Sequence, residues 1–238
     1  MEGADRQPGD ALPGPDGEVR GDHLGFVAHE VRNPLSTALW SAELLARLSA
    51  EERGGARGEK LTAMCLRSLG RVRQLVEDHF LCERLDARGI PMRLEAVPVR
   101  ALLGELVGRR TLELKDPEIG IAPEVSVEAD RILLDRALEA LLERAGRDGS
   151  QVRISGGDEG GRVAIRVNGA APGPDALEDP KKGSPGDPRG RALALPMARR
   201  IAAALGGALA VEADALVLFL PPAVFPPDAV VGEPPHPP

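Results

Sequence analysis

Three residues near the N-terminus have the types and the spacing that phosphoryl chemistry needs. Residues 26–35 read FVAHEVRNPL, in which Glu30 directly follows His29 and Asn33 lies four residues after the histidine. A neutral imidazole can attack a phosphoryl group, and an adjacent carboxylate can orient the ring and take its proton. An amide one helical turn further on can position a water molecule. The segment therefore predicts a nucleophile, its acid–base partner and a water-positioning residue.

A long amphipathic helix is expected to carry these three residues. Its apolar stripe consists of Leu24, Val27, Val31, Leu35, Ala38, Ala42, Leu45 and Leu48. The face around His29 is polar and lies about 100° or more from that stripe, so His29 should be exposed. Trp40, about three turns further on, is either an exposed anchor for a partner or a residue of a dimer or domain contact.

A second helix should follow a break at residues 51–60. Its apolar stripe consists of Leu61, Cys65, Leu69, Val72, Val76 and Cys82, and ends near Leu85. A connection this short predicts that the two helices are antiparallel. Two helices alone cannot enclose their apolar faces, so the hairpin is expected to dimerise into a four-helix bundle.

From about residue 89 the pattern changes to an α+β domain. Strand-like runs lie at residues 91–97, 125–129, 151–157, 162–169, 208–213 and 215–221, and helical runs at 99–110, 130–147 and 192–206. We therefore expect an α/β sandwich with helices on one sheet face. The predicted organisation is a flexible leader (1–20), a helical hairpin (21–88), the α/β domain (89–221) and a Pro-rich flexible tail (222–238).

Composition excludes several classes of function for this chain of 238 residues. Aromatic residues make up 2% and the net charge is −7, which argues against binding to nucleic acid or to an anionic membrane. The longest apolar runs, such as 215–220, are far shorter than the roughly 20 residues of a membrane-spanning helix, and no export signal opens the chain. We expect a cytoplasmic protein without a metal site, in which Cys65 and Cys82 only pack.

The run His29-Glu30-x-x-Asn33-Pro34-Leu35 resembles the H-box of sensor histidine kinases. In that family the H-box lies on the first helix of a dimeric bundle, and a second helix follows across a short loop. The resemblance implies that His29 is the phospho-acceptor and that Asn33 takes part in dephosphorylating a partner. It extends over about residues 22–220 and implies an ATPase-like sandwich of the histidine kinase type for the second half.

The ATP site that the family carries in this sandwich is degenerate here. Its first signature, NLLxNAxK, corresponds to residues 140–147, where Ala140 and Arg144 replace both asparagines. The second of these asparagines normally holds Mg²⁺, and an arginine cannot coordinate a cation.

Two further signatures of the ATP site are also altered. In the DxGxG signature at residues 167–171, Val167 replaces the Asp that accepts from adenine, Gly169 is kept and Ala171 replaces the second Gly. In the GxGL signature Gly190 is kept, but Ala192 replaces the glycine that lets backbone approach phosphate. The missing adenine acceptor alone would cost about 1–3 kcal/mol. We therefore predict that the domain uses neither ATP nor Mg²⁺ as a cofactor.

An intact H-box beside a degenerate ATP site indicates a histidine phosphotransferase in a two-component phosphorelay. Its partners would be response-regulator receiver domains, which supply Mg²⁺, and a second copy of the chain. Three alternatives remain open. The chain could be a response-regulator phosphatase that uses Glu30 and Asn33, a scaffold without phosphoryl chemistry, or a divergent active kinase in which Arg144 and Arg147 grip the phosphates.

Overall fold

The computed structural model describes residues 15–109, 112, 114–147, 149, 151–178 and 192–224, without the side chains of residues 15–24. The chain divides into two compact units, Met1–Val76 and Glu77–Pro238. Within the described ranges no helix is both long enough and apolar enough to cross a membrane.

The first unit is built on a helical hairpin. Helix α1 spans Pro15–Arg47, the short helix α2 spans Ala50–Arg53, and α3 spans Ala56–Asp86 and continues into the second unit. The predicted leader is wrong over its last residues, because α1 begins at Pro15. A proline suits a first helical turn, since it lacks only an N–H that would have no helical partner there.

The predicted break at residues 51–60 is also mostly helical. Ser49 caps α2: its hydroxyl accepts from the backbone N–H of Glu52 at 3.2 Å, and the Glu52 carboxylate accepts from the Ser49 N–H at 3.0 Å. This capping box satisfies two backbone donors that a helix end otherwise leaves unpaired. Only Gly54 and Gly55 lie between α2 and α3. The glycines therefore indicated the position of the turn correctly, but the turn is shorter than the predicted break at 51–60.

Each helix of the hairpin carries two rows of apolar side chains along its length. The sequence pattern predicted only one of the two rows. The seam of the hairpin buries Val27, Ala38, Ser41 and Leu48 of α1, and Leu61, Ser68 and Leu75 of α3. Leu35 and Ala42 were expected in this stripe but are exposed, as is Leu69 in the second helix. Small side chains therefore occupy part of the buried seam between the two helices. Larger apolar side chains lie in a second row that is exposed.

The second unit is an α/β sandwich, which confirms the predicted class. Its strands are β1 (Leu94–Pro98), β2 (Lys115–Ile121), β3 (Ser126–Asp130), β4 (Gln151–Asp158), β5 (Val163–Asn168), β6 (Ala208–Glu212) and β7 (Ala215–Leu220). Its helices are α4 (Val99–Val107), α5 (Arg131–Ala145), a 3-10 turn η1 (Pro174–Leu177) and α7 (Ala194–Ala204).

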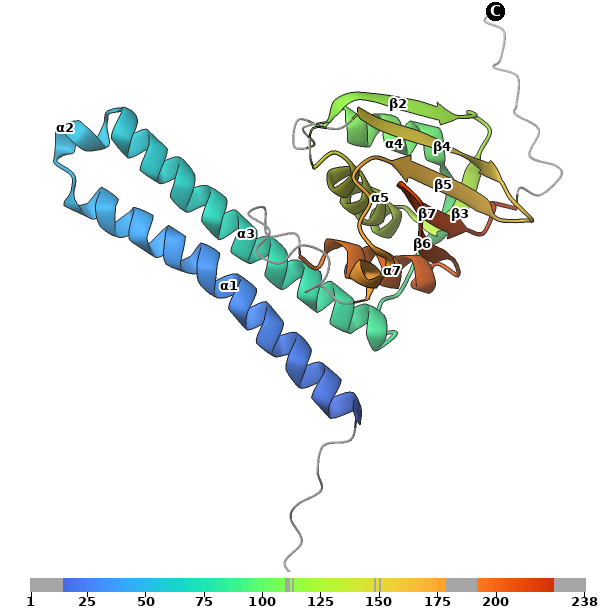
Figure 1. The fold of residues 1–238 in the computed structure, drawn as a ribbon, viewed down its shortest axis with the longest axis horizontal. Coiled ribbons are helices and arrows are strands. Elements are labelled where there is room, and N and C mark those ends of the chain that lie inside the picture. Colours follow the sequence, from blue (N-terminus) through green and yellow to red (C-terminus); the bar gives the residue numbers. More distant parts are fainter. Residues whose placement is uncertain are drawn as a thin grey trace, which may run out of the picture. The chain divides into compact units, whose positions relative to one another are not determined.

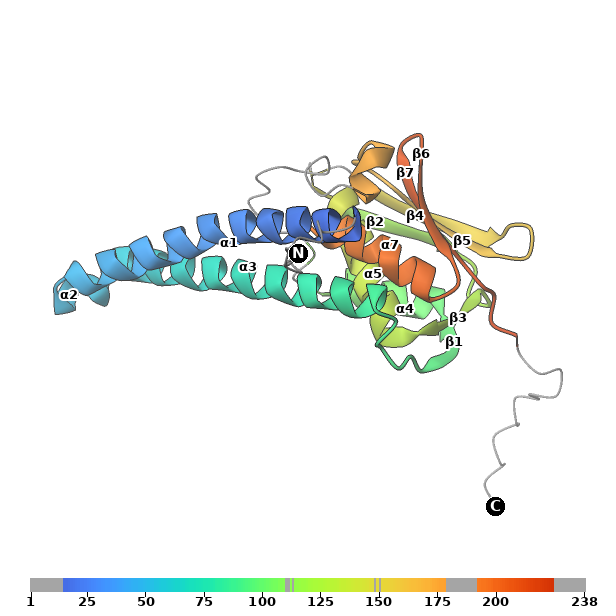
Figure 2. The same cartoon turned by 90° about the horizontal axis from the view of Figure 1, so that it is seen from below.

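The main sheet has the strand order β2-β4-β5-β7-β6, and β1 pairs with β3 in a separate ribbon. Helices α4, α5 and α7 lie against one face of this sheet (Figures 1 and 2). The pair β2–β4 is parallel and the other neighbours in the sheet are antiparallel. The register of β5 on β7 runs from Val163 opposite Leu220 to Asn168 opposite Ala215.

Strand β2 was not expected from the sequence. Its residues KDPEIGI contain Pro117 and three charged side chains, which are depleted in ordinary strands. A proline is tolerated in a strand at the edge of a sheet because its missing N–H does not interrupt a ladder on both sides. The position of β2 at the end of the strand order satisfies this condition.

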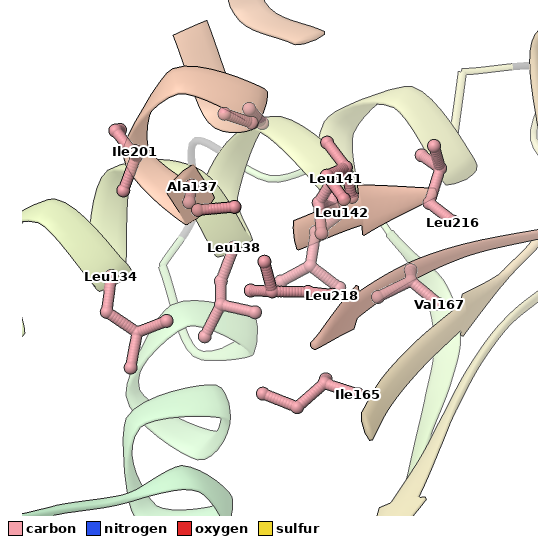
Figure 3. Packing of buried hydrophobic residues seen from close by; sticks show 14 of the residues in the cluster. Leu134, Ala137, Leu138, Leu141, Leu142, Ile165, Val167, Ile201, Leu216 and Leu218 are labelled. Atoms are coloured by element: carbon pink, nitrogen blue, oxygen red, sulfur yellow. The ribbon is translucent and has the colours of Figure 1, made fainter. Parts of the chain in front are cut away.

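One apolar layer between the sheet and helices α5 and α7 forms the centre of this unit. Figure 3 shows α5 residues such as Leu138 and Leu142 directed toward Ile165 of β5 and Leu218 of β7. These four side chains are at most 1% exposed. Asp130 fixes the start of α5, because its carboxylate accepts from the N–H groups of Ile132 and Leu133.

Replacing Leu138 by Ala should lower the free energy of unfolding by about 2–5 kcal/mol, because it opens a cavity in this layer. Ile132→Ala on the same helix is the control: Ile132 is 76% exposed, so its truncation should change the free energy by about 0.5 kcal/mol or less. Urea unfolding of the purified chain measures both. Equal effects of the two variants would contradict this description of the core.

Candidate functional site

His29 lies on the exposed face of α1, as predicted. Its side chain is 66% exposed, and its Nδ1 atom lies 3.6 Å from Oε1 of Glu30, whose side chain is only 10% exposed. This distance allows electrostatic attraction when the imidazole is protonated, but it is too long for a hydrogen bond. The arrangement leaves the imidazole accessible to a partner and places the acid–base group on the Nδ1 side.

A proline within α1 weakens the helix immediately beyond His29. Pro34 has no N–H to donate to the carbonyl of Glu30, and a proline ring inside a helix crowds the carbonyl four residues earlier. Further along, the hydroxyl of Thr37 donates to the carbonyl of Asn33 at 3.1 Å, and Ser41 donates to the carbonyl of Thr37 at 2.7 Å. The backbone between Glu30 and Pro34 thus lacks one helical hydrogen bond.

Asn33 is exposed on α1, four residues after His29. Residues four apart on a helix are surface neighbours, so the structure brings the imidazole and the amide to one face. Three of the predicted functional groups, on His29, Glu30 and Asn33, therefore lie within little more than one turn. Trp40, the candidate anchor further along α1, is also exposed, at 54%.

The first pair of altered nucleotide-site positions lies on α5. Ala140 is 1% exposed and belongs to the apolar core, and Arg144 is half-buried near the end of the same helix. A methyl group in the core offers no polar atom to a ligand. At this position packing, rather than recognition of a polar ligand, accounts for the residue present.

The next positions follow strand β5. Val167 is 1% exposed and packs in the same apolar layer (Figure 3). Gly169 has a φ of 153°, and a Cβ atom there would lie 2.6 Å from the carbonyl oxygen of Ala145, which accepts from the N–H of Ala170 at 2.9 Å. The close approach to the end of α5 requires glycine at 169 whether or not a nucleotide binds.

The remaining positions follow β5 or precede α7 in the sequence. Ala171 is half-buried after β5, and Ala192 is 6% exposed just before α7. Gly190 lies outside the described residues. Gly206, with φ of 74°, follows the end of α7, and the N–H of Gly207 donates to the carbonyl of Ala202 at 2.8 Å.

Cys82 is a packing residue of the apolar core, in agreement with the sequence, and Cys65 is half-buried. Both are free thiols on α3, and Cys82 is 1% exposed. Burial raises the pKa of the Cys82 thiol to about 12. A thiol with so high a pKa remains protonated at neutral pH and is a poor nucleophile or metal ligand.

Two ion pairs of the second unit were not predicted from the sequence, although the position of Asp78 in an apolar stripe indicates one of them. Asp78, with a fully buried side chain, accepts from Nη2 of Arg136 on α5 at 2.8 Å. It lies in the apolar stripe between Leu75 and Cys82, where a charge requires a partner. The second pair joins Asp86 to Arg200 of α7, which lies 114 residues further along the chain, and no local pattern could have indicated it.

Comparison with known proteins bears on both parts of the chain. Residues 19–88 match the His Kinase A (phospho-acceptor) domain. A structure of the Acinetobacter baumannii histidine kinase AdeS aligns with a TM-score of 0.61 at 18% identity and covers 80% of this chain and 94% of that one. At this identity the likeness concerns the fold.

A second solved structure is similar over most of this chain. The full-length protein ShkA in complex with AMPPNP aligns with a TM-score of 0.55 at 25% identity. The alignment covers 86% of this chain but only 46% of ShkA, so the chain spans less than half the length of that protein. Both similarities extend beyond the phospho-acceptor domain into the α/β unit.

Proposed function

We propose that the chain acts in two-component signalling as a histidine phosphotransferase that does not use ATP. The match of residues 19–88 to the His Kinase A (phospho-acceptor) domain and the similarity of the fold to histidine kinase structures support this proposal. The observation that carries the proposal is the contrast between its two sites. His29 is exposed beside Glu30, whereas Ala140 and Val167 of the nucleotide site are apolar and buried.

The proposed reaction uses His29 as the nucleophile toward a receiver aspartyl phosphate. Nε2 attacks phosphorus, the P–N bond forms as the P–O bond breaks, and the receiver aspartate leaves as a carboxylate. Glu30 faces the other ring nitrogen, Nδ1, and shortening their 3.6 Å separation would allow it to hold the proton there. The reverse reaction passes the phosphoryl group to a second receiver.

Burial at the degenerate positions supports independence from ATP. An adenine amine without its carboxylate acceptor loses about 1–3 kcal/mol, which is roughly a 5- to 150-fold loss of affinity. Two further replacements also disfavour ATP binding. Arg144 stands in place of a residue that binds Mg²⁺, and Ala192 stands in place of a glycine. A phosphorylated receiver supplies an already activated phosphoryl group, so the transfer needs no nucleotide.

The test incubates the purified chain with γ-labelled Mg-ATP in one arm and with a labelled phosphorylated receiver in the other. We expect label on the chain only in the receiver arm, and we expect His29→Ala to abolish it, because the variant lacks the imidazole that attacks the phosphoryl group. His236→Ala, at a histidine to which the sequence assigns no role, is the matched control.

Each arm can contradict a different part of the proposal. Label on His29 from Mg-ATP would identify an active kinase in which the altered nucleotide positions have been functionally replaced. Receiver-dependent label that persists in His29→Ala would rule out His29 as the acceptor. Folding of the variant is checked by circular dichroism, since His29 is exposed and its removal should leave the helix content unchanged.

A response-regulator phosphatase is the second candidate function, favoured by the exposed amide of Asn33 one turn beyond His29. Under this alternative Asn33→Ala should slow receiver dephosphorylation at least tenfold, because the attacking water loses its positioning group, whereas His29→Ala should keep most of the activity. Ser36→Ala, also exposed on α1, is the control. Loss of dephosphorylation in His29→Ala alone would favour the phosphotransferase.

The proposed active form is a homodimer through the hairpin. Large apolar side chains lie exposed on both helices, at spacings of three and four residues or their sums: Leu35 and Leu39 on α1, and Leu66, Leu69, Val76 and Phe80 on α3. Exposure of these rows of apolar side chains to water is unfavourable, and a second copy of the same hairpin offers a matching apolar surface. A four-helix bundle would cover them.

Leu66→Glu should convert the dimer to a monomer. Leu66 is 64% exposed in the single chain, so the charge costs little there but would be buried without a partner in the bundle. Light scattering after size exclusion measures the mass, and Lys60→Glu at an exposed polar position of α3 is the matched control. A monomeric wild-type chain at micromolar concentration would contradict the dimer.

A further inference from the structure

The second unit contains a cavity of about 470 Å³ beside the C-terminal end of α3. Arg84 and Asp86 of that helix line it, together with Arg88 just beyond the helix and Arg200 of α7. Its apolar lining includes Ile90 and Met92 from the segment before β1. The volume falls in the range of small-molecule sites, and the combination of an apolar wall with a few charged groups is typical of them.

The charges in this cavity are unbalanced. Asp86 binds Arg200, whose Nε atom lies 2.9 and 3.0 Å from the two carboxylate oxygens. Arg84 and Arg88 add two further guanidinium groups, so the cavity has three cations and one anion among its lining residues. A guanidinium presents several donors in a planar fork that matches phosphate and carboxylate oxygens.

The backbone holds one of these arginines in a conformation that arginine disfavours. The N–H of Arg88 donates to the carbonyl of Leu85 at 3.1 Å, and the N–H of Gly89 donates to the carbonyl of Arg84 at 2.9 Å. This is the Schellman ending of a helix, in which Arg88 takes the left-handed position with φ of 49°. Glycine is the usual residue at this position, yet here it follows one residue later.

From these observations we infer that the cavity binds a small organic dianion, with its anionic end on Arg84 and Arg88 and its apolar body against Ile90 and Met92. Asp86 keeps Arg200 occupied, so Arg84 and Arg88 supply the charge that the ligand neutralises. The cavity shares no lining residue with the phospho-acceptor segment or with the nucleotide positions, and ligand binding there requires neither phosphoryl transfer nor ATP. It would make the end of α3 responsive to a metabolite with a phosphate or two carboxylates.

Calorimetric titration of the full chain with phenyl phosphate tests the inference, because this probe combines a dianion with an apolar ring. We expect saturable binding with a dissociation constant below about 1 mM, weaker binding of inorganic phosphate and none of benzyl alcohol. No saturable binding of phenyl phosphate up to about 10 mM would overturn the proposal. Equal binding of benzyl alcohol would do so too, because the arginines would then have no role.

Two variants locate the site within the chain. Arg84→Gln and Arg88→Gly should each weaken phenyl phosphate binding at least tenfold, and Arg162→Gln, at an exposed arginine of the second unit, should not. Arg88→Gly should also raise Tm by about 2–4 °C, because glycine relieves the left-handed strain. Unchanged affinity in both cavity variants would show that the probe binds elsewhere and would overturn the assignment.

Discussion

The α/β unit depends on the large apolar layer between its main sheet and helices α4, α5 and α7. Ala140 and Val167 are part of that layer. A polar group placed there needs a partner, because an unpaired buried donor or acceptor costs about 1–3 kcal/mol. At both positions an apolar residue therefore serves the packing of this layer.

A different constraint governs α1, which packs on one side and leaves the face that carries His29 uncovered. The seam of the hairpin uses small side chains such as Ala38 and Ser41, so the helices approach closely on one side while His29 stays on the other. Pro34 removes one backbone hydrogen bond just beyond the histidine. The helix is thus packed along one side and has one turn with a missing hydrogen bond beside His29.

Most helices and strands were predictable because their apolar residues recur with the period of the element they form. Strand β2 was not, since an edge strand tolerates Pro117 and charged residues, and its pairing with β4 depends on residues more than thirty positions away. The exposure of His29 followed from the helical face alone. The Asp86–Arg200 pair and the arginine-lined cavity did not, because they exist only once α7 packs beside the end of α3.

The last turns of α3 belong to the α/β unit through two kinds of contact. Cys82 and Leu85 join its apolar core, and Asp78 and Asp86 each bind an arginine of a different helix. A buried ion pair adds little net stability, because the desolvation of both charges offsets their attraction, but breaking it leaves an unpaired charge. Such pairs favour one alignment of packed helices over alternatives with similar apolar contact. The apolar contacts thus supply the affinity of α3 for the unit, and the buried Asp78 fixes its register on α5. The more exposed Asp86–Arg200 pair contributes less to this alignment.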